Sequence, residues 1–275
     1  MLNQLLLAFL AAFLLTSCHQ ASETEKPAAP AAPAGEWVGT GPQRLWTQTY
    51  RSAQLTDHPT LLLVLHGDAP FNRPAYQYAL ARQVAQANAN VVAVGLLRPG
   101  YTDPAGHQSA GERGEATGDN YTPAVIDAVA AALTTLKARY QAGRVVVAGH
   151  SGGAAITADL LGRHPGLADA ALLASCPCNV AAWRTHMKRQ VGGPVWDLPT
   201  QSISPEQVVA RIPAATRVTL LTGTADTIAP PALTKEYYGR LQRQGISAKL
   251  RELPAQGHDL FLAKDVQQEV SQLLK

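Results

Sequence analysis

Cysteine, charge and long apolar runs are all scarce in this sequence. Its 275 residues include only three cysteines. The cysteines and histidines show none of the ligand spacings of a metal site, and no glycine-rich phosphate loop occurs, so we expect no metal ion and no cofactor. The net charge is only +3 and the basic residues are scattered, which excludes a nucleic-acid-binding surface. No internal repeat occurs, so repeat architectures are excluded as well.

The one pronounced apolar stretch, residues 2–15, is too short and wrongly flanked for a spanning helix. The tetrapeptide Leu15-Thr16-Ser17-Cys18 follows it directly. Together they resemble a bacterial lipoprotein signal with its lipobox. The resemblance implies a signal peptide over residues 1–17, cleavage before Cys18 and acylation of that cysteine. It predicts a lipid bilayer partner in the bacterial cell envelope, on the periplasmic side or at the cell surface. An ordinary cleaved secretory signal and an uncleaved anchor are the alternatives.

The chain after the signal divides by composition. Residues 18–42 are rich in alanine and proline, which predicts an extended tether that cannot bury enough apolar surface to fold. Residues 43–275, about 230 in number, suit a single catalytic domain with a sizeable core. The sequence leaves the oligomeric state open.

Apolar runs alternate with helical patterns within that domain. The strand-like runs fall at 44–51, 61–66, 91–96, 144–148, 170–173, 217–221 and 248–253. The helical patterns fall at 74–86, 123–140, 154–163, 230–243 and 259–274. This alternation predicts an α/β fold with a mostly parallel central sheet and helices on both faces.

The segment Gly149-His150-Ser151-Gly152-Gly153 lies between a predicted strand and a predicted helix. Gly-x-Ser-x-Gly in that context is the pattern of a nucleophile elbow. The turn is too tight for side chains at Gly149 and Gly153, and it holds the Ser151 hydroxyl at the positive end of the helix dipole. The alternative is a glycine-rich turn with a capping serine.

Two candidate partners for Ser151 follow later predicted strands, in the order Asp226 and then His258. The carboxyl ends of parallel strands share one edge of a sheet, where catalytic groups collect. A serine hydroxyl needs a base, which His258 can supply, and a carboxylate on the far ring nitrogen fixes the tautomer, which Asp226 can supply. The other carboxylates considered for this role are those of Asp119, Asp159 and Glu252.

With these residues the chain resembles the α/β-hydrolase superfamily over about residues 43–275. A strand ending in His66-Gly67 matches the start of the family's oxyanion loop, and Leu97 to Tyr101 resembles another common hydrolase loop. The resemblance implies Ser151 as nucleophile, Asp226 as acid and His258 as base. His66 itself is expected to be structural, bracing the loop.

The same resemblance implies an oxyanion hole of backbone N–H groups. One donor is that of Gly152, and the second is that of Asp68 or Ala69. Asp68 stands where a small residue is common in the family. Because its carboxylate would oppose a developing oxyanion, we expect that side chain to point away from the site.

Cys176 and Cys178 are separated only by Pro177. An oxidising cell envelope permits a disulfide, although a Cys-x-Cys ring is tight. A possible disulfide and two free thiols are both compatible with the sequence.

Residues 176–204 form a long excursion, where the family often inserts a lid. Asn179 can cap a short helix in it, with Val180, Trp183 and Met187 on one face. That face either covers a substrate pocket or packs on the core.

Three functions fit these features. The first is hydrolysis of a small-molecule carboxylic ester through an acyl-enzyme. The second is peptide or amide cleavage, which needs a group for a peptide terminus; Arg98 and Glu112 are the candidates. The third is a tethered binding protein on a degenerate hydrolase fold, against which the complete Ser, Asp and His order argues.

Overall fold

The structure, a computed structural model, describes residues 34–39, 43–69, 72–113 and 120–275. The predicted signal peptide, Cys18, most of the predicted tether and Asp119 lie outside these residues. Within the described part of the chain, no helix combines the length and apolar character needed to cross a membrane.

One eight-stranded sheet organises the domain, in the order β1-β2-β4-β3-β5-β6-β7-β8. β1 pairs antiparallel with β2, and β2 pairs antiparallel with β4, whereas all other pairs are parallel. The strands span Ala34–Val38, Leu45–Arg51, Thr60–Leu65, Val91–Leu96, Arg144–His150, Ala170–Ala174, Arg217–Gly223 and Ser247–Leu253. The predicted mostly parallel sheet is therefore confirmed.

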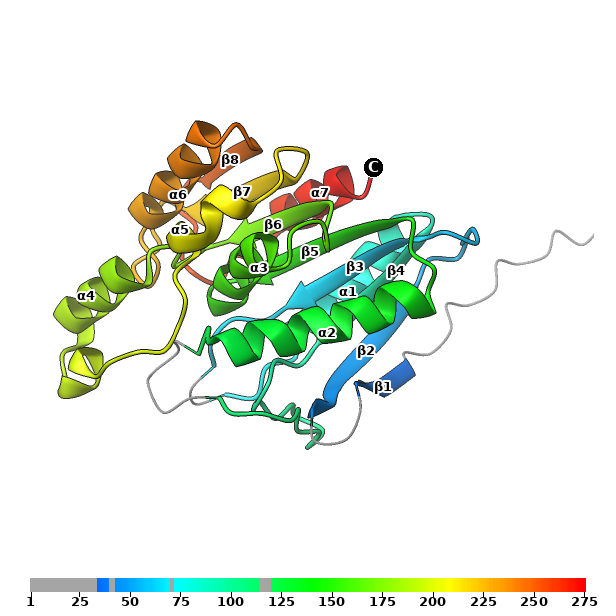
Figure 1. Cartoon of the computed structure of the whole chain (residues 1–275), viewed down its shortest axis with the longest axis horizontal. Helices are drawn as coiled ribbons and strands as arrows, with labels where there is room; N and C mark the ends of the chain where they lie inside the picture. Colours follow the sequence, from blue (N-terminus) through cyan, green and yellow to red (C-terminus); the bar gives the residue numbers. More distant parts are fainter. Residues whose placement is uncertain (1–33, 40–42, 70–71, 114–119) are drawn as a thin grey trace, which may run out of the picture.

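Helices cover both faces of this sheet, and Figure 1 shows α2 and α3 on one side and α1 and α7 on the other. The longer helices are α1 (Tyr76–Ala87), α2 (Pro123–Arg139), α3 (Gly152–Arg163), α4 (Val180–Val191), α6 (Pro231–Arg243) and α7 (Lys264–Leu273). The short helical turns are η2 (Pro194–Asp197), α5 (Pro205–Val208) and η3 (Val209–Arg211).

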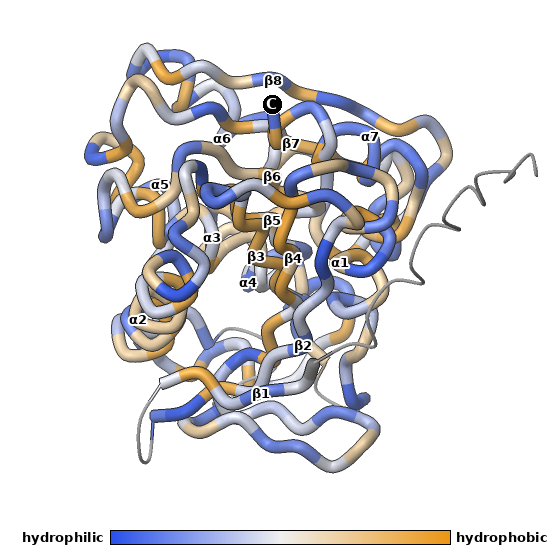
Figure 2. Tube along the Cα trace, turned by 90° about the vertical axis from the view of Figure 1, so that its right-hand side faces the viewer, coloured by the Kyte–Doolittle hydropathy of each residue, from blue (hydrophilic) through white to orange (hydrophobic). Residues whose placement is uncertain are grey.

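The alternation of side chains along the central strands divides the core into two layers. Leu61, Leu63 and Leu65 of β3 pack with α2 and α3, whereas Leu62 and Val64 pack with α1 and α7. Because both faces are covered, these strands are hydrophobic without interruption. Figure 2 shows this apolar concentration along β3, β4 and β5 at the centre of the molecule.

The predicted boundary between tether and domain is wrong. β1 (Ala34–Val38) lies within residues 18–42 but pairs with β2 along its whole length. The edge-to-face contact of Trp37 with Trp46, whose ring centroids are 5.1 Å apart, anchors the added strand. The ordered domain therefore includes residues 34–38.

The predicted last helix begins too early. α7 begins at Lys264 after Ala263, whereas residues 259–274 were expected to be helical. The residues between His258 and α7 are irregular and contain a turn instead of the first turns of a helix.

The segment 176–204 contains α4 and η2, beyond the carboxyl ends of the strands (Figure 1). Asn179 caps α4 as predicted, accepting a hydrogen bond from the N–H of Ala182. Trp183 and Met187 are buried against Trp196 of η2 and Leu233 of α6. The apolar face of α4 is thus filled by packing within the domain, as in the second of the two alternatives.

Candidate active site

The turn between β5 and α3 has the geometry of a nucleophile elbow. Ser151 has a φ of 51°, in the left-handed region that side chains rarely adopt. A Cβ on Gly149 would collide with the backbone of Gly153, and a Cβ on Gly153 would collide with the carbonyl oxygen of His66. Glycine at both positions therefore lets β5, α3 and the end of β3 approach closely, as the sequence predicted.

The structure brings Ser151, His258 and Asp226 together from three strand ends. The Ser151 Oγ lies 3.0 Å from His258 Nε2. His258 Nδ1 lies 2.9 Å and 3.1 Å from the two carboxylate oxygens of Asp226. This is the spacing at which an imidazole can accept the serine proton while the carboxylate holds the opposite nitrogen protonated.

The carboxylate of Asp226 is buried, being only 4% exposed as a residue. Its Oδ1 accepts hydrogen bonds from the N–H groups of Ile228 and Ala229, both at 2.9 Å. Burial acts to raise the pKa of Asp226, but the hydrogen bond and charge of His258, with further hydrogen bonds, lower it below its usual value. The group is therefore held ionised beside the imidazole.

The other carboxylates considered for this role lie elsewhere. Asp159 is buried within α3, and Glu252 on β8 pairs with Lys235 at 2.6 Å. Asp119 lies outside the described residues. Asp226 is the carboxylate that contacts His258.

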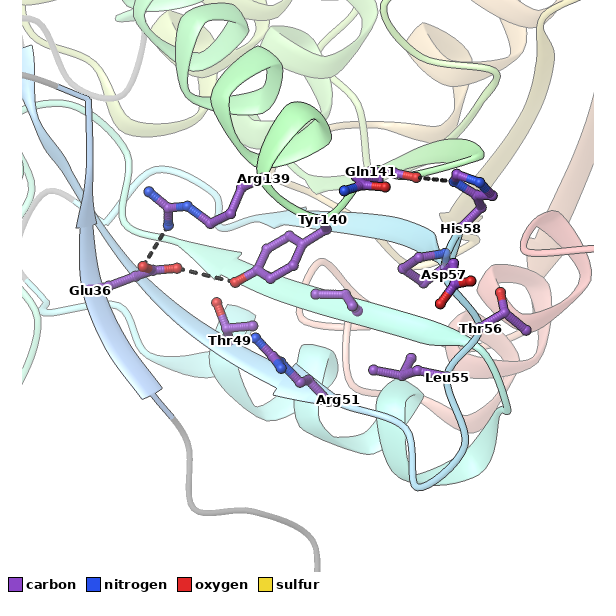
Figure 3. A pocket seen from close by; sticks show the side chains of 12 residues that line it. Glu36, Thr49, Arg51, Leu55, Thr56, Asp57, His58, Arg139, Tyr140 and Gln141 are labelled. Atoms are coloured by element: carbon purple, nitrogen blue, oxygen red, sulfur yellow. Dashed lines mark hydrogen bonds and ion pairs between the residues drawn. The ribbon is translucent and has the colours of Figure 1, made fainter.

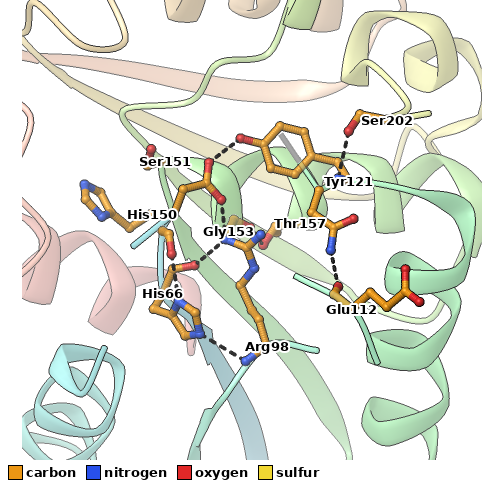
Figure 4. A network of polar contacts seen from close by, with 12 residues as sticks. His66, Arg98, Glu112, Tyr121, His150, Ser151, Gly153, Thr157 and Ser202 are labelled. Carbon is orange, nitrogen blue, oxygen red and sulfur yellow. Dashed lines mark hydrogen bonds and ion pairs between the residues drawn. The ribbon is translucent and has the colours of Figure 1, made fainter. Parts of the chain in front are cut away.

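A buried ion pair lies beside the elbow (Figure 4). Arg98 Nη1 donates to Asp68 Oδ1 at 2.9 Å, and the side chain of Arg98 is 1% exposed. The hydroxyl of Tyr121 donates to the other oxygen of Asp68 at 2.6 Å. The carboxylate lies so close to Gly152 that a Cβ there would collide with it. The carboxylate of Asp68 is thus turned to Arg98 and Tyr121, which compensate its charge beside Gly152.

His66 has the structural role expected for it. Its Nδ1 bonds to the carbonyl of Gly67 at 2.7 Å, and its Nε2 accepts the N–H of Arg98 at 3.0 Å. Burial, followed by the charge of Arg98, lowers the pKa of His66 well below its usual value. The neutral ring thus joins the oxyanion loop to the next loop along the sheet.

The predicted oxyanion donors lie at the first turn of α3 and after β3. The N–H of Gly152 opens α3, where a helix has no intrahelical acceptor for it. The N–H groups of Asp68 and Ala69 both follow the end of β3, and both stay candidates for the second donor.

Three further residues, with no role expected from the sequence, connect to His258 directly or through one another. His150 and Ser175 both contact the carbonyl oxygen of His258, at 2.9 Å and 3.4 Å. Tyr76 contacts His150 in turn. His150 is the first of the two variable residues of the elbow motif and Ser175 directly precedes Cys176, so only these positions beside Ser151 and Cys176 could have indicated a role.

The two cysteines beyond β6 form a disulfide, Cys176–Cys178, with both residues fully buried. It closes the turn between Ser175 and α4. Of the two alternatives, the structure contains the bridge.

The opposite edge of the sheet carries a polar cavity of about 770 Å³. Figure 3 shows Glu36, Arg139 and Tyr140 on one side of it and His58 on the other. Glu36 bonds to both Arg139 and Tyr140. The residues that line this cavity lie around the end of β2, the start of β3 and the end of α2, away from Ser151. In the described part of the chain, no group of three or more His, Cys, Asp and Glu side chains could hold a metal ion.

Comparisons with known proteins agree with this geometry. The profile described as the prolyl oligopeptidase family matches residues 103–275. Among curated proteins, no sequence match to this chain was found.

Several solved structures share the fold. An esterase from Pyrococcus furiosus is 16% identical with a TM-score of 0.65, and the match covers 88% of this chain and 90% of that one. An acylaminoacyl peptidase from Pyrococcus horikoshii is 12% identical with a TM-score of 0.64, and the match covers 86% of this chain but 39% of that one. Est1E from Butyrivibrio proteoclasticus is 14% identical with a TM-score of 0.65, covering 87% and 97%. The fold is that of the α/β-hydrolases, as the sequence predicted.

Proposed function

This chain belongs to the prolyl oligopeptidase family, and we propose that it is a serine hydrolase that cleaves carboxylic esters. The observation that carries the proposal is the continuous hydrogen-bonded line from Ser151 Oγ through His258 to Asp226. The family and the fold support a serine hydrolase in general. The preference for esters depends on the surroundings of these residues.

In the proposed reaction, Ser151 Oγ attacks the ester carbonyl as His258 Nε2 takes its proton. The N–H of Gly152 and that of Asp68 or Ala69 stabilise the oxyanion. His258 then protonates the leaving alcohol, which departs as the acyl-enzyme forms. Water, deprotonated by the same imidazole, then attacks the acyl carbon. The bond from that carbon to Ser151 Oγ breaks, His258 returns the proton to Oγ, and the carboxylic acid leaves.

Two observations favour esters over peptides. Arg98, one of the two candidates for binding a peptide terminus, is buried. Its guanidinium forms an ion pair with Asp68 and donates a hydrogen bond to the carbonyl of His66. By contrast, Ile228 and Leu262, which closely follow Asp226 and His258 in the chain, are 40% and 45% exposed. Exposed apolar side chains close in the chain to Asp226 and His258 suit an apolar acyl or alcohol group better than a charged terminus.

Peptide or amide cleavage is the second candidate. The family description and the acylaminoacyl peptidase similarity favour it. Glu112 is exposed and lies beyond β4, where it is available to a positively charged group.

The test compares short-chain nitrophenyl esters with aminoacyl anilides, using the native chain and Ser151→Ala. We expect kcat/KM to be higher for the esters, and we expect Ser151→Ala to lower kcat by about 10⁴- to 10⁶-fold. A preference for the anilides supports the peptidase instead. A fluorophosphonate probe that fails to label the folded native chain supports the third function, a binding protein.

The lipid anchor is part of the same proposal. The resemblance of residues 1–18 to a lipoprotein signal supports attachment of the enzyme to a bilayer through acylated Cys18. Cys18→Ala, expressed in a bacterium, is expected to move the protein from the membrane fraction to the soluble fraction. Recovery of both chains in the soluble fraction contradicts the anchor.

A further inference from the structure

We infer that His150 is a positioning residue that holds the general base His258 in place and connects it to the oxyanion loop. The inference rests on the proposed role of His258 as the base. His150 directly precedes the nucleophile Ser151 and takes no part in the proposed reaction itself.

His258 lies in an exposed stretch of a loop whose two ends are buried. Residues 254–257 and Asp259 are exposed, whereas Leu253 before them and Leu260 and Phe261 after them are buried in the core. The carbonyl oxygen of His258 accepts a local hydrogen bond from Leu260 N–H at 2.9 Å. His150 Nε2 adds a contact at 2.9 Å and Ser175 Oγ one at 3.4 Å, both from strand ends of the sheet. The stronger of these two contacts to the rigid scaffold comes from His150.

The hydrogen-bond directions along this network are consistent with one another. The N–H of Gly67 donates to the hydroxyl oxygen of Tyr76. The carbonyl oxygen of His258 can only accept, so His150 carries its proton on Nε2, 2.9 Å from that oxygen. In the neutral ring Nδ1 is then an acceptor, and the Tyr76 hydroxyl, 2.9 Å away, donates its proton to it. A single tautomer of His150 satisfies both ends.

The surroundings of His150 keep this tautomer neutral. His150 is 4% exposed, and its ring stacks on Phe261 with centroids 5.3 Å apart and planes 23° apart. Burial, followed by the charge of His258, lowers the pKa of His150 to about 3. The facing charged groups are His258 and the carboxylate of Asp226, whose attraction is the weakest of these influences. Protonation of His150 would also place a second proton on Nδ1, facing the proton of the Tyr76 hydroxyl.

The network thereby joins three loops that must keep a fixed geometry. Gly67 precedes the candidate donor Asp68, His150 precedes the nucleophile, and His258 is the base. A shift of the His258 backbone would lengthen the 3.0 Å contact to Ser151 Oγ, and misplacement by about 1 Å can cost about 100-fold in rate.

The test uses two isosteric substitutions at His150. The amide nitrogen of Gln can replace Nε2, so His150→Gln retains a donor to the His258 carbonyl. The shorter Asn can accept from Tyr76 through its amide oxygen but cannot reach that carbonyl. We expect His150→Asn to lower kcat for a nitrophenyl ester by about 10- to 100-fold with KM changed by less than about twofold. We expect His150→Gln to recover kcat to within about fivefold of the native enzyme.

A second pair of variants separates positioning from general loss of stability. Tyr76→Phe removes the hydroxyl between Gly67 and His150. Tyr78→Phe, two residues away on α1, removes a buried hydroxyl that bonds to Asp103 at 3.3 Å. We expect both to lower the melting temperature, but only Tyr76→Phe to lower kcat.

The outcomes are distinguishable from those of the proposed function. An unchanged kcat in His150→Asn, or an equal loss of kcat in the Asn and Gln variants, overturns the inference while the native enzyme and Ser151→Ala still establish the hydrolase. A native chain without turnover or probe labelling overturns the proposed function, and the positioning role falls with it.

Discussion

The carboxyl ends and the amino ends of the central strands, here called the carboxyl edge and the amino edge of the sheet, differ in how deeply their charged side chains are buried. At the carboxyl edge, Arg98 and Asp226 are buried and each is held by at least two polar partners. At the amino edge, the ion pair of Glu36 with Arg139 leaves both side chains about one third exposed beside an open cavity (Figure 3). Burying a charge is costly unless it is paired, whereas an exposed pair costs and contributes little.

This difference indicates that the carboxyl edge is the more rigid of the two. Buried, fully bonded charges cannot rearrange without losing several partners at once, so the groups around Ser151 are preorganised. The amino edge has a cavity of about 770 Å³ but no comparable network among the described residues that line it. A cavity alone therefore does not locate Ser151, Asp226 and His258 in this molecule, and variants at the two edges can test that contrast.

The largest effect on catalysis at the carboxyl edge, after loss of Ser151, is expected from Asp226→Asn. The substitution keeps the shape but removes the charge that fixes the His258 tautomer. We expect kcat for a nitrophenyl ester to fall by about 10⁴-fold with little change in KM. The circular dichroism spectrum serves as the control for folding. A loss below about tenfold would reassign the acid to another carboxylate.

Arg98→Met is expected to have the largest effect on stability. It leaves the carboxylate of Asp68 without its ion-pair partner beside Gly152, which typically costs about 3–5 kcal/mol of unfolding free energy. Urea denaturation measures this loss. The double variant Arg98→Met with Asp68→Asn is the control and is expected to recover much of the stability. If the single and double variants are equally unstable, the loss comes from packing and not from the stranded charge.

Asp159→Asn is expected to stabilise the protein at neutral pH. Burial raises the pKa of Asp159 well above its usual value, and neither carboxylate oxygen has a hydrogen-bond partner among the described residues. Below the unfolded pKa of about 3.9, Asp159 is protonated in both the folded and the unfolded state, so it does not make stability depend on pH. As pH rises above that value toward the folded pKa, only the unfolded state ionises, and the free energy of unfolding falls steadily. Since Asn cannot ionise, we expect a gain of about 1–3 kcal/mol at pH 7 that shrinks toward pH 4.

Urea denaturation of both chains across that pH range measures the difference for Asp159→Asn. Because all other titrating groups are shared, they cancel in the comparison. A difference that does not vary with pH would mean that Asp159 is ionised in the fold.

The sequence predicted the parts of the site that local patterns encode. Ser151, Asp226 and His258 each follow a hydrophobic strand, and parallel pairing brings such positions to one edge, so the order of the three was informative. β1 was missed because five residues after an alanine and proline-rich segment carry little periodicity. Its position depends on pairing with β2 and on the contact between Trp37 and Trp46.

The supporting network was not predictable in the same way. The charge of Asp68 is compensated by Arg98 and Tyr121, which lie 30 and 53 residues away along the chain. The link from Tyr76 through His150 to His258 likewise spans 74 and then 108 residues. Such contacts depend on side-chain directions in the folded domain, and a single sequence gives no periodicity from which to infer them.

The smallest effect is expected at the amino edge, from Glu36→Gln. It removes an exposed ion pair with Arg139, so we expect unfolding free energy to change by less than about 1 kcal/mol and kcat/KM to stay unchanged. Glu269→Gln is the matched control, because that carboxylate is 1% exposed and bonds to Lys249 and Arg251, far from Ser151 in the chain. We expect it to cost about 1–3 kcal/mol, again with unchanged kcat/KM. If Glu36→Gln instead lowers kcat/KM by tenfold or more, the two edges are coupled and the cavity in Figure 3 takes part in function.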